Sequence, residues 1–182
     1  MTRDPDRLRL HDAGIRVDNM PPTGRGLRLA PDAEEREALA AALGISAVER
    51  LEVSLQAVKF RGGMRVTGQL EAEIVQPSVV SLEPVRQVIV EPIDRVFLPG
   101  PGKPAPGAEI YVDLEADDPP DHFEGPEADM SDLVIETLAL AIDPYPRAEG
   151  ESVETLGLPV DEDDEPSPFA RLKVLKNPGD GG

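Results

Sequence analysis

Four basic side chains near a predicted hairpin are of the types that contact phosphate groups. Arg61 and Arg65 flank a Gly-Gly pair, Lys59 precedes it, and Arg86 lies on a later segment. Guanidinium and ammonium groups neutralise nucleic-acid phosphates, so these four residues are candidate RNA contacts. Acidic neighbours and a low aromatic content of 3% are typical of an ordinary charged hairpin without a base-stacking platform. Both interpretations remain open.

Polar side chains also interrupt an apolar, strand-like stretch at residues 75–84. Gln76, Ser78 and Glu83 stand among Val, Leu and Pro residues there. A bulged strand would use such side chains to satisfy backbone groups, whereas a contact surface would present them to a partner. We treat these three residues as candidate partner contacts.

A second unusual segment, residues 141–147, follows a predicted helix and contains two prolines. Because proline fixes the backbone, Asp143, Tyr145 and Arg147 are held in defined directions. Tyr145 either packs on the core at a rigid helix exit or is exposed, since a rigid loop with Tyr and Arg is typical of contact surfaces. These three residues complete the candidate partner contacts.

Motifs that would indicate catalysis are scarce. The chain has no Cys, which excludes a thiolate metal site and a cysteine nucleophile. No Walker or dinucleotide glycine pattern occurs. His11 and His122 lie in predicted loops without ligand spacing, and Ser78 and Ser81 lack a nucleophile-elbow pattern. We therefore expect no enzyme, no cofactor, no metal and no small-molecule substrate.

The formal net charge of −18 is confined to one stretch of the chain. Residues 113–165 hold 19 acidic and 1 basic side chains, whereas residues 1–112 hold 16 and 14, and residues 166–182 hold 1 and 3. Because the charge is concentrated in one stretch, the electrostatic potential that a partner meets differs between that stretch and the rest of the chain. The acidic stretch is either a docking surface for a basic ribosomal protein or a solvated loop and tail, and in the first case the near-neutral part contacts RNA or another protein.

The elements that must position these residues form an α+β domain. Caps and apolar stripes predict two main helices, at about residues 32–43 and 130–142, the second with a capping pair at Asp129 and Asp132. Alternating apolar residues from 45 to 98 predict a bent antiparallel meander, partly barrel-like, with a hairpin turn at residues 61–63. Residues 79–82, 85–96 and 109–114 are expected as further strands, and residues 117–129 as a loop.

The predicted core consists of apolar residues on the helix stripes and on alternate strand positions. They are Leu39, Leu43, Leu51, Val53, Leu55, Val66, Leu70, Ile74, Val88, Val90, Val134, Leu138 and Ile142.

The expected organisation is a flexible N-terminus at residues 1–12, one domain at 13–150 and an acidic, mostly disordered tail at 151–182. No apolar run is long enough to cross a membrane, and the start lacks the apolar region of a signal peptide. We expect a cytoplasmic protein that does not contact membranes.

Four motifs carry a family resemblance. They are Arg65-Val-Thr-Gly68, Ile74-Val-Gln76, Val79-Val-Ser-Leu-Glu-Pro-Val85 and Leu138-Ala-Leu-Ala-Ile-Asp-Pro-Tyr-Pro-Arg147. Over residues 13–150 the chain resembles the YceD family, bacterial proteins linked to accumulation of large-subunit ribosomal RNA, and it looks most like the alphaproteobacterial branch. Ser167-Pro-Phe-Ala-Arg-Leu172 resembles the usual C-terminal end of the family. Members commonly carry Cys where this chain has Ser78, so no metal is expected at that position here.

The resemblance implies a role in ribosome biogenesis and does not imply an enzyme. The leading hypothesis is a non-catalytic factor for large-subunit ribosomal RNA processing or assembly that binds a basic ribosomal protein or a pre-ribosomal particle. The alternative is direct binding of ribosomal RNA through the basic hairpin. A hydrolase or nuclease that uses clustered carboxylates and a divalent ion ranks third.

Overall fold

The computed structural model describes residues 8–100 and 119–151. The strand expected at residues 109–114, the acidic tail beyond residue 151 and the segment at 167–172 lie outside the described residues. Of the expected flexible N-terminus, residues 8–12 are described, and Leu10 among them is buried in the core. No helix in the described part is long and apolar enough to span a membrane.

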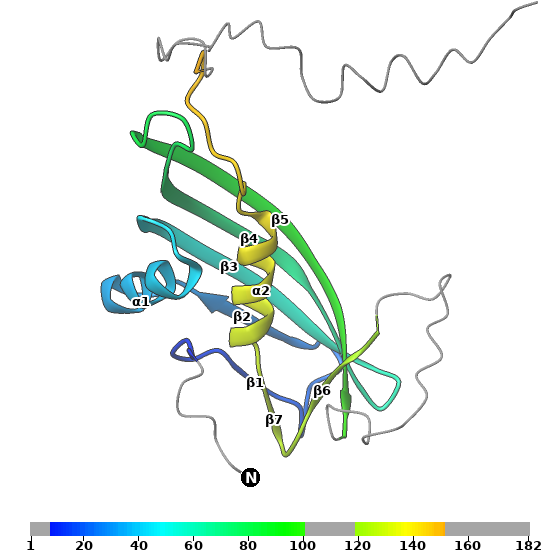
Figure 1. Ribbon diagram of the computed structural model, residues 1–182. Helices are drawn as coiled ribbons and strands as arrows, with labels where there is room; N and C mark the ends of the chain where they lie inside the picture. The colour runs from blue at the N-terminus through cyan, green and yellow to red at the C-terminus, as the bar shows by residue number, and fades with distance from the viewer. Residues whose placement is uncertain (1–7, 101–118, 152–182) are drawn as a thin grey trace, which may run out of the picture. The chain divides into compact units, whose positions relative to one another are not determined.

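The described chain forms an α+β domain, as predicted (Figure 1). In chain order the elements are β1 (Gly14–Arg16), β2 (Arg25–Leu29), α1 (Ala33–Leu43), β3 (Ala47–Phe60), β4 (Gly63–Pro77), β5 (Pro84–Pro99), β6 (Asp121–Phe123), β7 (Glu127–Asp129) and α2 (Ser131–Ala141).

One five-stranded sheet dominates the fold, in the order β2-β3-β4-β5-β6. The first four strands form the antiparallel meander that the alternation predicts, and β6 joins β5 in parallel at residues 97–99. A separate pair, β1 with β7, is antiparallel. The sheet bends strongly in Figure 1 but does not close into a barrel, since β2 and β6 remain its two edges.

The core lies between the inner face of this sheet and the two helices. Leu51, Val53 and Leu55 of β3 alternate with exposed polar residues, and β4 alternates in the same way. Leu39 of α1 and Leu138 of α2 are fully buried in the same apolar cluster. The predicted core is confirmed on β3, β4 and the helices, with Leu43 and Ile142 packed at its margin.

On β5 the predicted core residues are wrong. Val88 and Val90 are 72% and 52% exposed, whereas Ile89, Ile93 and Phe97 are buried. Residues 87–90 are mostly apolar on both faces, so the sequence does not reveal which set points inward. A register error of one residue moves every side chain to the other face.

Three local expectations are also corrected. Residues 79–82 are a turn and its exit rather than a strand, and residues 117–129 contain β6 and β7 rather than only a loop. The capping box predicted at the start of α2 does not form. Met130 occupies its N-cap position, and Asp129 Oδ1 instead accepts a hydrogen bond from the Ser131 N–H. The cap of α1 is confirmed, with Asp32 and Glu35 in a reciprocal capping box.

Candidate functional site

The β4–β5 turn is organised around Ser78, which is fully buried. The Ser78 Oγ accepts hydrogen bonds from the N–H groups of Val80 and Ser81, at 3.0 and 3.2 Å. Its own N–H donates to the Glu83 carbonyl at 2.8 Å, and its carbonyl accepts from the Leu82 N–H at 3.1 Å. Four hydrogen bonds through one residue fix the course of the turn. They also explain why a small hydroxyl side chain stands there.

Residues 141–147 are hydrogen-bonded to this turn although they lie more than 60 residues away in sequence. The Val79 N–H donates to the Pro146 carbonyl at 2.9 Å, and Gln76 Nε2 donates to the Asp143 carbonyl at 3.1 Å. The structure therefore joins the two segments that carry the candidate partner contacts. Gln76, Ser78 and Glu83 lie on one side of this junction, and Asp143, Tyr145 and Arg147 lie on the other.

A second group of polar contacts, made by Gln87, lies where α2 ends. Gln87 of β5 donates from Nε2 to the Ala141 carbonyl at 2.9 Å, and its Oε1 accepts from the Asp143 N–H at 3.1 Å. Asp143 Oδ1 in turn accepts from the Tyr145 N–H at 2.8 Å. These bonds satisfy backbone groups left open at the helix C-terminus and fix the direction of the exit.

Apolar side chains project outward from this constrained junction. Val79, Leu82 and Tyr145 are 47%, 76% and 70% exposed. Leu82 also has a left-handed backbone with φ of 64°, which is unusual for a branched apolar residue. We call these three residues the turn surface. Exposed apolar groups on a fixed backbone are typical of a binding surface.

Gln76 carries one unsatisfied polar atom. Its side chain is buried, and Oε1 has no hydrogen-bond partner among the described residues. A buried carbonyl oxygen without a donor is costly, and an ordered water commonly fills this role.

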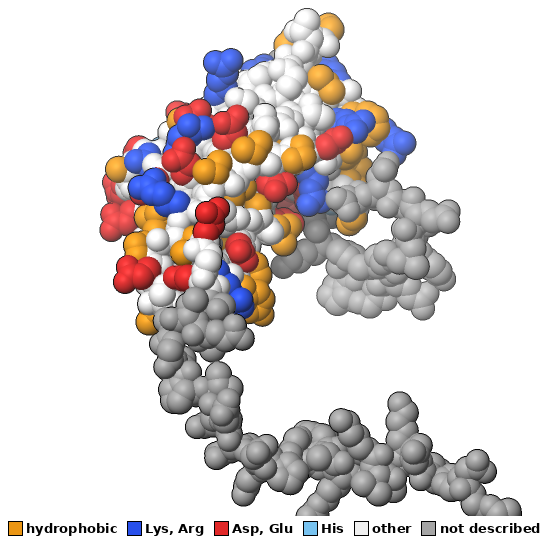
Figure 2. Space-filling view, turned by 90° about the horizontal axis from the view of Figure 1, so that it is seen from above, with side chains coloured by type: hydrophobic (Ala, Val, Ile, Leu, Met, Phe, Trp, Pro, Cys, Tyr) orange, Lys and Arg blue, Asp and Glu red, His pale blue; other side chains and the backbone are white. Residues whose placement is uncertain are grey.

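The four candidate RNA contacts are not brought together. Arg65 forms a bidentate ion pair with Asp94, and Arg86 forms an ion pair with Glu49. Arg65 and the partner of Arg86 in the sheet, Val75, are ten positions apart on β4, which is about 33 Å of strand. Arg86 therefore belongs to the opposite end of the sheet. Figure 2 shows basic and acidic side chains interspersed on the face seen there, as such pairing implies.

Lys59 and Arg61 remain at the β3–β4 hairpin, which is the turn predicted from the glycines. Arg61 and Gly62 have φ of 47° and 82°, as a two-residue hairpin turn of type I′ requires. The Arg61 guanidinium lies 5.0 Å from the centre of the Phe60 ring. Neither cation has an ion pair within the described residues.

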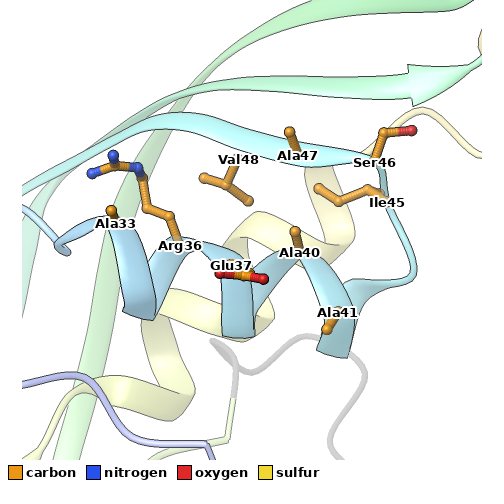
Figure 3. Close-up of a pocket in the computed structure, with 9 residues that line it drawn as sticks. All are labelled: Ala33, Arg36, Glu37, Ala40, Ala41, Ile45, Ser46, Ala47 and Val48. Atoms are coloured by element: carbon orange, nitrogen blue, oxygen red, sulfur yellow. The ribbon is translucent and has the colours of Figure 1, made fainter.

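The described surface offers little for small-molecule chemistry. Its described residues contain no group of three or more His, Cys, Asp or Glu that could hold a metal. Figure 3 shows a shallow hollow of about 420 Å³ between α1 and the start of β3, with Ala40, Ile45 and Val48 among its lining residues and Arg36 and Glu37 on the helix side.

The sequence did not indicate that Val79 and Leu82 belong to the site. Because residues 79–82 are mostly apolar, they were predicted to form a strand. Two signals in the sequence contradict a strand, namely the Ser78 hydroxyl and the proline at position 84. Arg25 was also missed, since only the pairing of β2 with β3 places it near the hairpin.

The comparison with protein families covers both segments of the junction at the β4–β5 turn. A family model described as large ribosomal RNA subunit accumulation protein YceD matches residues 66–176. The chain belongs to the YceD family. The matched span includes most of β4, the whole β4–β5 turn and the exit of α2. Searches among curated proteins and among solved structures gave no match.

Membership in the YceD family links the protein to the accumulation of large-subunit ribosomal RNA. YceD is not known as a family of enzymes. The closer likeness to the alphaproteobacterial branch stays a prediction.

Proposed function

We propose that the protein is a non-catalytic, cytoplasmic factor in large-subunit biogenesis that binds a ribosomal protein or a pre-ribosomal particle through the turn surface. One observation carries the proposal. Two distant segments of the family-matched region are hydrogen-bonded into a single rigid junction, and Val79, Leu82 and Tyr145 project from it.

The physical argument is one of preorganisation. Binding costs less conformational entropy when the contact residues are already fixed, and Ser78 and Gln87 fix this junction from both sides. Tyr and Leu supply apolar area, and Tyr and Arg are the residues most often found at energetic centres of interfaces. Glu83, Asp143 and Arg147 are exposed around the apolar residues and provide a polar rim.

The charge distribution supports a basic partner. The acidic excess lies in residues 113–165, which include α2 and the exit that carries Tyr145. Opposite charges accelerate encounter and select the partner, while the apolar centre supplies most of the affinity. Basic ribosomal proteins meet both requirements.

The test uses the full-length protein and purified large-subunit precursor particles in sedimentation assays. The double variant Leu82→Asp and Tyr145→Ser should weaken co-sedimentation at least tenfold and lower large-subunit ribosomal RNA levels in cells. Leu140→Asp is the matched control, because Leu140 is also 76% exposed but lies on α2. Particle binding that survives the double variant would reject the proposal, and so would equal losses in both variants.

Direct binding of ribosomal RNA is the second candidate function. The observation that favours it is that two cations at the hairpin end of the sheet, Lys59 and Arg61, have no ion pair in the part of the chain that the structure describes. Arg65 and Arg86 contribute less in this account, since carboxylates already neutralise both of them.

A further inference from the structure

Arg25 presents an unsatisfied donor at the hairpin end of the sheet. Its Nε is buried and has no hydrogen-bond partner within the described residues. A guanidinium nitrogen that is removed from water without an acceptor is unfavourable. An acceptor supplied by a ligand would remove this cost.

The strand register brings Lys59 next to Arg25. Arg25 pairs with Ala57, which is fully buried on the inner face, and Lys59 is two residues further along β3. Residues two positions apart on one strand face the same side, so Lys59 faces the same side as Ala57. Arg25 and Lys59 are then diagonal neighbours on adjacent strands, and such neighbours are about 7–8 Å apart. Arg25 and Lys59 therefore share one face, and Arg61 follows in the turn.

Two shallow hollows lie at this end. One, of about 400 Å³, is lined by residues that include Arg16, Arg25 and Glu127. The other, of about 290 Å³, is lined by Val17, Lys59, Phe60, Arg61 and both hairpin glycines. Arg16 lines the first hollow and Val17 lines the second, and these are consecutive residues at the end of β1.

The local charge at these hollows is positive. Arg16 is held by Asp18, and this ion pair lowers the pKa of the Asp18 carboxyl, with a smaller contribution from Arg25. Glu127 lines the first hollow, whereas Asp18 lines neither. Among the described residues that line the two hollows, one acid, Glu127, stands against four bases, namely Arg16, Arg25, Lys59 and Arg61.

We infer that Arg25, Lys59 and Arg61 form a binding site for successive phosphates of an RNA backbone, which we call the phosphate site. Phosphate oxygens would supply the acceptor that Arg25 Nε lacks, and two hollows with basic linings at one end of the sheet suit a repeating anion better than a single one. The choice of RNA rests on the proposed role in large-subunit RNA accumulation, but it does not depend on the protein contact at the turn surface.

The test measures binding of the full-length protein to a fluorescent 20-nucleotide single-stranded RNA as salt is raised from 50 to 200 mM. Three phosphate contacts predict that affinity falls about 20-fold over this range, with a log–log slope near −2. The triple variant Arg25→Gln, Lys59→Gln and Arg61→Gln should remove most of the affinity and flatten the slope. The double variant Lys59→Gln and Arg61→Gln keeps the partly buried Arg25 and tests the same surface if the triple variant does not fold.

Arg28→Gln is the matched control. Arg28 is on the same strand as Arg25 and has no ion pair within the described residues, but it pairs with Ser54 on the outer face. It should change affinity less than twofold. The Leu82→Asp and Tyr145→Ser variant should bind this RNA normally, so failure of the phosphate site and failure of the turn surface are distinguishable.

Three results would overturn the inference. The first is an absence of RNA binding at 50 mM salt. The second is unchanged RNA affinity in a folded Lys59 and Arg61 variant. The third is equally tight, equally variant-sensitive binding of poly-glutamate, which would assign the surface to an acidic protein.

Discussion

The two turns at opposite ends of β4 differ in the side chains that they expose and in the interactions that hold them. The β3–β4 hairpin carries two cations, Lys59 and Arg61, that form no ion pair with residues 8–100 or 119–151. It is held by close backbone packing, since a Cβ on Gly63 would lie 2.0 Å from the Phe97 carbonyl oxygen. The β4–β5 turn has apolar residues at its surface and is held by the Ser78 hydrogen bonds.

This difference teaches how one strand can serve two kinds of partner. A charged ligand needs cations that are free of carboxylates, and the tight glycine turn provides an exposed place for them. An apolar contact needs a fixed backbone, because exposed Leu and Tyr side chains would otherwise lose entropy on binding. Three variants separate the two ends, and a fourth tests the edge strand β6.

The largest expected effect is at the hairpin. Gly63→Ala places a methyl group against the backbone of β5 and should lower the free energy of unfolding by about 2–4 kcal/mol. Urea unfolding followed by circular dichroism measures this. Gly62→Ala is the control, since it meets no atom within 4 Å and only has to adopt a left-handed backbone, at a cost of about 1 kcal/mol. Equal losses in the two variants would contradict close packing of the hairpin on β5.

At the other turn, Ser78→Ala should lower the free energy of unfolding by about 1–3 kcal/mol, because the N–H groups of Val80 and Ser81 lose their acceptor. Particle binding should fall as well, since the turn surface is no longer fixed. Ser54→Ala, on the exposed outer face of β3, should change stability by less than about 0.5 kcal/mol. A Ser78 variant with normal stability and normal particle binding would show that the turn does not need its hydroxyl.

A smaller effect is expected from the carboxylate at the phosphate site. Asp18→Asn removes a negative charge near Arg25 and releases Arg16, so RNA affinity should rise about threefold at low salt. Because Arg16 lowers the pKa of Asp18, this carboxyl stays ionised from pH 5 to 8, and titration of the natural protein should not mimic the substitution. Asp94→Asn, which releases Arg65 instead, should change affinity less. A larger gain in the Asp94 variant would move the RNA contact to Arg65.

The smallest effect concerns Asp121 of β6, whose pKa is raised by burial, against the attraction of Arg95 and with added repulsion from Glu136. The folded state binds this proton more tightly than the unfolded chain does, so ionisation costs stability as pH rises above the ordinary value of 3.8. Asp121→Asn should therefore raise stability at pH 7 by less than about 1 kcal/mol, after allowance for solvent screening. The gain should vanish at pH 3 in thermal unfolding.

Glu124→Gln, an exposed neighbour, is the control for Asp121 and should change stability at pH 7 by less than about 0.5 kcal/mol. Destabilisation by Asp121→Asn at pH 7 would mean that the attraction to Arg95 outweighs burial.

The sequence predicted those parts of the fold in which local pattern and tertiary structure agree. The alternation on β3 and β4, the glycines of the hairpin and the Asp32 cap of α1 each follow from local chemistry. It also marked both segments of the junction at the β4–β5 turn, because polar residues and prolines are unusual in such positions. The hydrogen bonds that join those segments could not be predicted, since they connect residues 67 positions apart.

The failure on β5 has a physical cause. Its inward positions are not uniformly apolar, because Gln87 binds the end of α2 and Arg95 forms an ion pair with Glu136 of that helix. The outward Val88 and Val90 then look more like core residues than their inward neighbours do. Arg25 was missed for a related reason, as only the register of β2 on β3 places it beside Lys59.

The central claim is that the two ends of the sheet make separate contacts, one with phosphates and one with protein. The most direct measurement is the salt dependence of affinity for purified large-subunit precursor particles. The Lys59→Gln and Arg61→Gln variant should reduce the log–log slope by about 1.4, for two lost phosphate contacts. The uncharged variant Leu82→Ser and Tyr145→Ser should lower affinity and leave the slope unchanged, because it alters no charge. A change of slope in the turn variant, or an unchanged slope in the hairpin variant, would contradict the account.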